Sequence, residues 1–169
     1  MKKFFRKHRK KIGYAFLFAL IVIQFIRPER NSGNADGAND IMHFTSVSPD
    51  VKAILKTSCY DCHSDHTEYP WYTNIQPVGW WMQRHVNVGK REVNFSEFNT
   101  AKIRRAIRKF HEIGEQVAEN EMPLNSYLWI HGNAKLSDAQ KKVIMDWAKR
   151  NEDSLTSAYP DSVFNENRH

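Results

Sequence analysis

The sequence predicts an all-α protein, and three observations support this fold class. Apolar residues recur about every 3.6 positions along residues 103–117, which is the period of an amphipathic helix. Two segments carry helix-start signals, one at Ser48–Pro49 and the other a capping box formed by Ser137 and Gln140. No segment shows the sustained alternation of apolar and polar residues that is typical of a β-strand.

The first 27 residues have the composition of a membrane-targeting segment. Residues 1–11 contain seven Lys or Arg residues, and the fifteen residues from Ile12 to Ile26 are almost entirely apolar. A helix of this length spans about 22 Å, so flanking basic side chains would have to reach outward to match a hydrocarbon core of roughly 30 Å. We expect residues 1–27 to form an uncleaved N-terminal transmembrane helix, a signal anchor. The alternative is a cleaved signal peptide, for which residues 32–35 offer a weak cleavage site.

The net charge is distributed unevenly along the chain. The whole chain carries +6, but residues 1–30 hold nine Lys or Arg and one Glu, a local charge of +8 that leaves −2 for the remainder. A nucleic-acid-binding domain would need its basic surface in the folded part, so no nucleic-acid partner is expected. Dense positive charge before the apolar run keeps that end in the cytoplasm. We therefore expect a single-pass protein of the cytoplasmic (inner) membrane, with its folded domain on the periplasmic side.

Three parts follow the N-terminal segment. Residues 28–47 begin with a stretch rich in Pro, Gly and Asn, which predicts a linker. Residues 48–152 predict the helical domain, with a short first helix, a second helix from about Pro77, a long helix ended by Pro123, and a terminal helix after the capping box. Residues 153–169 predict a polar C-terminal tail.

Both cysteines of the chain lie in the stretch TSCYDCHSDH, as Cys59 and Cys62, with His63 directly after them. A thioredoxin-like redox pair would need a strand before a helix, and no strand is expected here. A zinc site would need further ligands in a second spaced group, and the chain has no other cysteine. A disulfide between residues three apart would close a loop too small to stabilise the fold much. A zinc site could use Cys59, Cys62 and either His63 or His66, and these alternatives stay open.

Covalent haem attachment uses all three residues of the motif. The two thiols form thioethers with the two vinyl groups of one porphyrin, and the histidine lies where it can bind the iron from one face. Haem is attached in this way outside the cytoplasm, which agrees with the expected export. We therefore expect one haem c, with its iron, per chain, bound covalently through Cys59 and Cys62, with His63 as the proximal ligand.

A second ligand of the iron must come from another segment of the chain. Met122 is the predicted distal ligand, because it precedes Pro123 where the long helix must break, and its thioether would lie on a loop free to approach the iron. His85 is the alternative and would give a centre with two histidine ligands. The remaining candidates are Met82, Met145, His66, His111 and His131.

The chain resembles two known patterns. A haem motif at the end of a first helix, a later Met-Pro loop and a terminal helix resemble class I cytochrome c. More closely, CYDCHSDHTEYPWYTNIQPVGWWMQRHVNVGKREVNFSEF and EMPLNSYLWIHGNAKLSDAQKKVIMDWA resemble the small bacterial haem-binding domain family, as does VIQFIRPERN near the N-terminus. This resemblance covers about residues 20–150 and implies an anchored, exported, cytochrome c-like helical domain around one covalently attached haem. It implies Cys59 and Cys62 as attachment residues and His63 as proximal ligand, whereas Met122 follows from the broader cytochrome c pattern.

Two further groups of residues fit a haem protein. A set of aromatic residues after the motif predicts either a wall around the macrocycle or ordinary core packing. A basic set on the long helix predicts a solvated face, with docking of an acidic redox partner or binding of the haem propionates as functional alternatives. The aromatic residues are Tyr69, Trp71, Tyr72, Trp80 and Trp81. The basic residues are Arg104, Arg105, Arg108 and Lys109.

The expected function is electron transfer by a membrane-anchored c-type cytochrome that passes single electrons between exported redox partner proteins. Ligation by His63 and Met122 would fill both axial positions and leave the iron no open site for a substrate, so an enzyme is not expected. One alternative is a peroxidase-like haem enzyme with Glu121, His66 or His85 as distal acid or base. The other is a haem-based sensor with an open distal site.

Overall fold

The computed structural model describes residues 2–160, with side chains from residue 8 onward. Within those residues all regular structure is helical, apart from one isolated bridge between Ser32 and His66. The all-α prediction is confirmed. The α-helices are α1 (Lys2–Ile23), α2 (Ile41–Phe44), α3 (Pro49–Ser58), α4 (Tyr60–His63), α5 (Val78–Glu92), α6 (Ile103–Ala118), α7 (Asn125–Leu128) and α8 (Asp138–Ala158). The 3-10 helices are η1 (Trp71–Asn74), η2 (Phe95–Thr100) and η3 (Gly132–Ala134).

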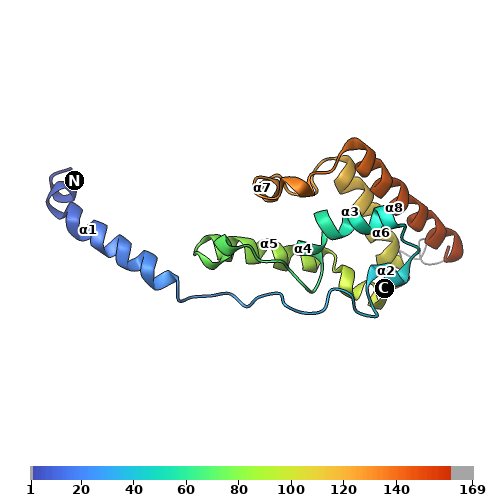
Figure 1. The fold of residues 1–169 in the computed structure, drawn as a ribbon, viewed down its shortest axis with the longest axis horizontal. Helices are drawn as coiled ribbons and strands as arrows, with labels where there is room; N and C mark the ends of the chain where they lie inside the picture. The colour runs from blue at the N-terminus through green and yellow to red at the C-terminus, as the bar shows by residue number, and fades with distance from the viewer. Residues whose placement is uncertain (1, 161–169) are drawn as a thin grey trace, which may run out of the picture.

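The core lies where α6 and α8 pack along each other, with α3 against α8 (Figure 1). Phe110 of α6 and Trp147 of α8 meet edge to face with ring centroids 5.4 Å apart, and both side chains are almost fully buried. Leu55 of α3 and Ile144 of α8 belong to the same buried cluster. The burial of α3 therefore fixes the position of Cys59, the residue that follows its last turn.

The helix-start signals correctly predict where two helices begin. The Ser48 hydroxyl accepts a hydrogen bond from the Val51 backbone N–H, and Ser137 and Gln140 form the reciprocal capping box. Helix α8 runs on to Ala158, so the first residues of the predicted polar tail, 153–169, are helical. Residues 161–169 of that tail lie outside the described part of the chain.

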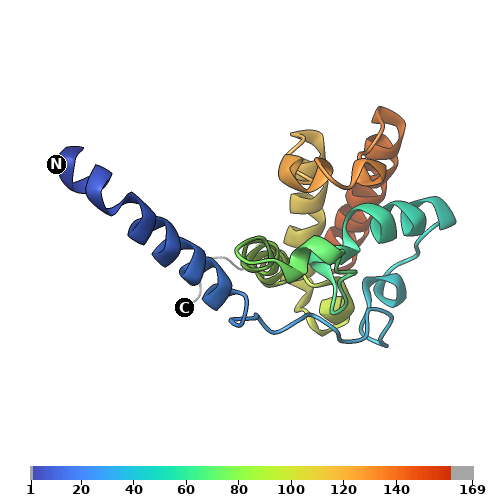
Figure 2. The same ribbon diagram turned by 60° about the vertical axis from the view of Figure 1, so that its left-hand side comes forward.

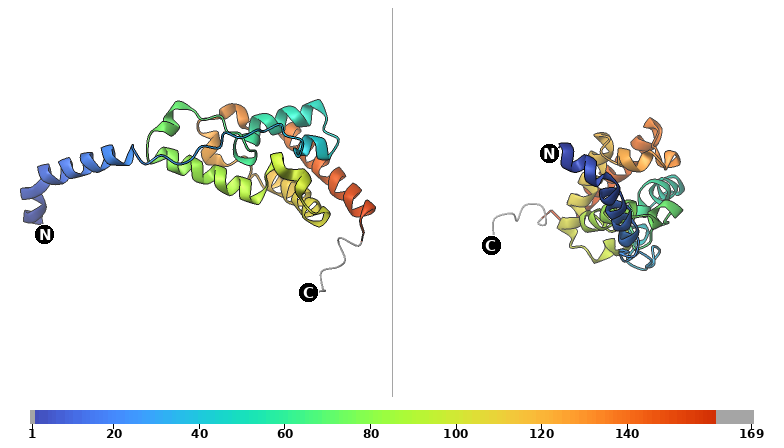
Figure 3. Two further views of the ribbon diagram at one scale, coloured as in Figure 1. Left: turned by 90° about the horizontal axis from the view of Figure 1, so that it is seen from below. Right: turned by 90° about the vertical axis from the view of Figure 1, so that its left-hand side faces the viewer.

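Helix α1 extends away from the other helices, and its apolar side chains from residue 12 onward are largely exposed (Figures 2 and 3). Among the described residues, no helix combines the length and the apolar character needed to cross a membrane. The structure therefore does not support the transmembrane helix predicted for residues 1–27. Helix α1 is 22 residues long, but a basic stretch fills its first half and shortens the apolar run.

Residues 28–47 differ from the free linker that their composition predicts. The chain runs extended along the domain and is held by side chains at several points (Figure 1). The Asn31 amide Nδ2 donates to the Ser64 carbonyl at 2.8 Å, and the Tyr60 hydroxyl donates to the buried Asp40 carboxylate at 2.8 Å. Ile41 is fully buried. Polar composition does not reveal such contacts, because each depends on a partner elsewhere in the fold.

Candidate haem site

The cysteine motif folds as a single tight turn. Helix α3 ends at Ser58, and the backbone of the next residue, Cys59, leaves the helical region with φ −128° and ψ −40°. The next residues form α4, and the Cys59 carbonyl accepts hydrogen bonds from both the Cys62 and His63 backbone N–H groups, at 3.2 and 3.0 Å. The two thiols and the imidazole thus come from one compact piece of backbone, which suits the attachment of one planar group.

A cavity of about 410 Å³ opens beside this turn, within the range of about 300–1,000 Å³ that is usual for ligand pockets. Cys59, His63 and Met122 all line it, so the fold brings together two predicted iron ligands that are 59 positions apart in sequence. Apolar side chains make most of the remaining wall. They are Leu55, Val93, Phe95, Ile113, Val117, Pro123, Leu136 and Ile144.

The His63 imidazole is oriented by the backbone. Its Nδ1 lies 3.0 Å from the Val93 carbonyl oxygen, which can only accept, so Nδ1 carries the proton and donates. The lone pair then resides on Nε2, the nitrogen available to a metal. Burial lowers the pKa of His63 below its ordinary value, which favours the neutral, ligating imidazole. Phe95 packs against the ring at a centroid distance of 5.7 Å.

The two cysteines are free thiols in an apolar setting. Burial raises the pKa of both Cys59 and Cys62 to about 12, so both are protonated at neutral pH. Redox-active cysteine pairs have lowered thiol pKa values instead, so this setting argues against a thioredoxin-like pair. Among the described residues, no group of three or more His, Cys, Asp or Glu side chains is placed to hold a metal ion.

Met122 reaches the cavity through the turn that follows α6. The helix ends at Ala118, and Asn120 takes the left-handed conformation, with φ 62°, that often closes a helix. The backbone N–H groups of Glu121 and Met122 then both donate to the Gln116 carbonyl, at 3.0 and 3.1 Å. The prediction that Pro123 ends the helix is therefore wrong in detail, because the chain leaves the helix four residues before Met122.

His85 lies away from the residues that line the cavity. Its Nδ1 is 2.8 Å from the Trp81 carbonyl oxygen, and its ring contacts the Trp81 ring at 4.4 Å. The other candidates, Met82, His66, His111, His131 and Met145, are likewise absent from the cavity wall. The structure thus brings Met122, and not His85, to the cavity that His63 lines.

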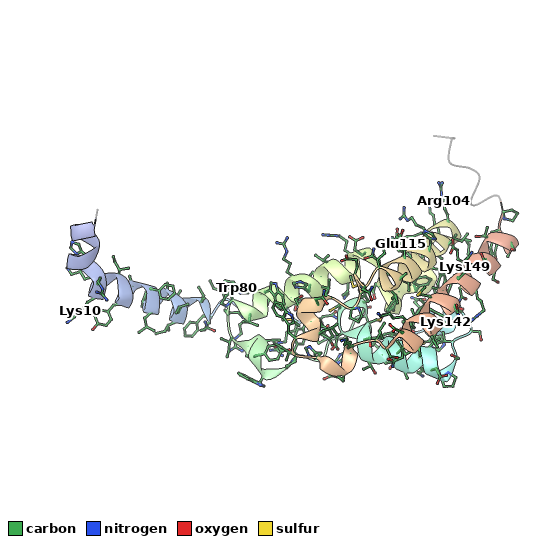
Figure 4. The ribbon with its side chains drawn as sticks, turned by 90° about the horizontal axis from the view of Figure 1, so that it is seen from above. Lys10, Trp80, Arg104, Glu115, Lys142 and Lys149 are labelled. Atoms are coloured by element: carbon green, nitrogen blue, oxygen red, sulfur yellow. The ribbon has the colours of Figure 1, made fainter. Side chains whose placement is uncertain are left out.

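The aromatic residues after the motif do not wall this cavity. None of the five lines it, and Trp71 is 75% exposed. Trp80 instead donates its indole N–H to the Ile26 carbonyl, where the domain meets the segment after α1 (Figure 4). The cavity wall comes from α3, α6 and α8 together with residues that follow α5 and α6. The period of 3.6 residues along α6 is the sequence signal that could have identified Ile113 and Val117.

A polar contact that the sequence did not predict ties α7 to the cysteine motif. The Tyr127 hydroxyl donates to the Asp61 carboxylate at 2.7 Å, and its ring stacks on His131 at 4.1 Å. The Tyr72 hydroxyl in turn lies 3.3 Å from His131 Nε2. Asp61 lies between the two cysteines, so this contact restrains the motif.

Gly89 of α5 allows the close packing of α5 on the motif, and we expect Gly89→Ala to disrupt it. A Cβ at this position would lie 2.6 Å from the Cys62 carbonyl oxygen, so α5 or the motif must shift. We expect a loss of about 2 kcal/mol in the free energy of unfolding, measured by denaturant titration. Gly114→Ala is the matched control, because its Cβ would make an ordinary 3.7 Å contact with Ala148. Equal stability of the two variants would contradict the close packing of α5 on the cysteine motif.

Fold and site together define a helical protein with an apolar cofactor pocket built on a CxxCH turn. The chain belongs to the haem-binding domain family, whose family model matches residues 18–150, more than half of the sequence. This confirms the resemblance to a small haem-binding family. Comparison with curated proteins and with solved structures finds no match.

Proposed function

We propose that this haem-binding protein is a c-type cytochrome with one haem per chain. Cys59 and Cys62 would form the two thioethers, His63 would bind the iron through Nε2, and Met122 would be the second axial ligand. The observation that carries the proposal is the shared cavity, in which Cys59, His63 and Met122 meet among apolar side chains. The two free thiols support it, because thioether formation adds a thiol S–H across a vinyl group without a change in oxidation state and so needs no oxidant.

The proposed activity is the transfer of single electrons between exported redox proteins. Haem, when bound, supplies a one-electron Fe(III)/Fe(II) couple. Two protein ligands would leave no open position for a substrate, and the apolar wall would keep water from the iron. Both features favour a carrier over a catalyst.

We propose that the N-terminal segment directs the domain across the inner membrane and keeps it there on the periplasmic side. The basic residues of 1–11, the exposed apolar side chains of α1 and the slightly acidic remainder support this placement. Fractionation of cells, with and without detergent, tests it. Recovery of the full chain in the soluble periplasmic fraction without detergent would contradict retention at the membrane.

Exogenous ligands separate a carrier from an enzyme or a sensor. We expect the haem-loaded full chain to take up carbon monoxide and cyanide slowly and only at high concentration, because Met122 occupies the position that they need. Met122→Ala should bind both readily, which makes it the matched positive control. Rapid binding by the unmodified chain would favour the peroxidase-like or sensor alternative.

A further inference from the structure

One buried cation stands among the apolar residues of the cavity. Of the described side chains that line it, Glu92 and Glu112 are acidic, and Lys109 is the one lysine or arginine. Lys109 is only 8% exposed, whereas Arg105 and Arg108 of the same basic set are exposed. A lysine is rarely this buried without an anion to bind. It therefore differs from the solvated face predicted for this set.

Glu112, the residue that now pairs with Lys109, also has a second basic partner. Lys109 Nζ lies 2.5 Å from Glu112 Oε2, and Arg108 Nε lies 3.5 Å from the other oxygen, Glu112 Oε1. If the ammonium group turned toward another carboxylate in the cavity, Glu112 would keep Arg108 as its counter-ion. Glu112 is also partly exposed, so water could solvate it.

We propose that Lys109 binds a propionate carboxylate of the haem, an inference that rests on the proposed function. Haem carries two propionates, and a carboxylate placed in an apolar cavity is costly unless a cation or hydrogen-bond donors compensate it. Lys109 is the described cation that lines this cavity and has the required charge. Its buried positive charge also favours the reduced haem, because reduction adds a negative charge nearby.

The test is a redox titration of the haem-loaded full chain and four variants. Lys109→Met and Lys109→Gln remove the charge, Lys109→Arg keeps it, and Arg105→Met removes an exposed charge about one helical turn away. We expect each neutral Lys109 variant to shift the equilibrium about tenfold toward the oxidised form, a potential about 59 mV lower for one electron. Lys109→Arg and Arg105→Met should stay within about twofold of the unmodified chain. The Lys109 effect should also persist at high salt, which screens exposed charges.

Every other outcome of the titration either supports the proposal or overturns it. Unchanged potentials in both neutral variants would overturn it, as would an equal drop in Lys109→Arg, which would mark a packing role. Haem loading that fails in all three Lys109 variants would also overturn it, whereas loading that fails only in the neutral pair would support a need for charge. If the unmodified chain carries no haem, the proposed function fails and this inference fails with it.

Discussion

Replacing Met122 with alanine is expected to abolish the weak long-wavelength absorption band of a sulfur–iron bond. It should also lower the reduction potential by on the order of 0.1 V, because a methionine ligand raises the potential of a haem and axial ligands set a range of about 0.8 V. Met122 is the methionine that lines the cavity with His63, so the loss should be specific to it. Absorption spectra and a redox titration of the haem-loaded full chain give both values.

Two variants control the Met122 experiment. Met145→Ala removes a methionine of α8 that does not line the cavity, and His85→Ala removes the rival ligand. Both should keep the sulfur–iron band. If the unmodified chain lacks that band and the spectrum of His85→Ala changes instead, the distal ligand is His85 and the Met122 assignment is wrong.

The second large effect is expected from His63→Ala. His63 lines the cavity and is oriented by its bond to the Val93 carbonyl, so its loss removes the proposed proximal ligand. We expect less than about a tenth of the haem incorporation of the unmodified chain, a loss of at least tenfold. Haem per chain, measured from the absorption of the denatured and reduced protein, is the readout.

His66→Ala is the matched control for His63. His66 lies three residues further on, is exposed, and has its Nε2 3.3 Å from Glu68 Oε1 rather than facing the cavity. It should incorporate haem as the unmodified chain does. Normal incorporation and an unchanged spectrum in His63→Ala would rule out its role as proximal ligand.

Local signals in the sequence predicted the parts of the fold that depend on neighbouring residues. The cap at Ser48, the capping box of Ser137 and Gln140, and the start of α5 after Pro77 each need only a few adjacent residues, and the structure has all of them. The end of α6 was predicted less well. Pro123 is a strong signal, but the left-handed Asn120 ends the helix first, and asparagine is a weaker sequence cue than proline.

The features that could not be predicted from the sequence depend on contacts between segments that are far apart along the chain. In sequence Lys109 is one of a run of basic residues with the exposed arginines beside it, and only the fold shows that it lines the same cavity as Cys59 and His63. The Tyr127–Asp61 bond joins residues 66 positions apart, which no local pattern predicts. The position of the aromatic residues after the motif allowed either a wall around the macrocycle or core packing, and none of them lines the cavity.

The central claim is that Cys59 and Cys62 hold a haem covalently, and one measurement tests it most directly. The full chain and its Cys59→Ser/Cys62→Ser variant would be produced in a host with cytochrome c maturation, and haem retention would be measured after denaturation and acid–organic extraction. The account predicts that haem stays with the unmodified chain, with the sharp reduced bands of a c-type haem, and is extracted from the variant. Haem extracted from both, or found in neither, would contradict covalent attachment and reopen the zinc and disulfide alternatives for the two cysteines.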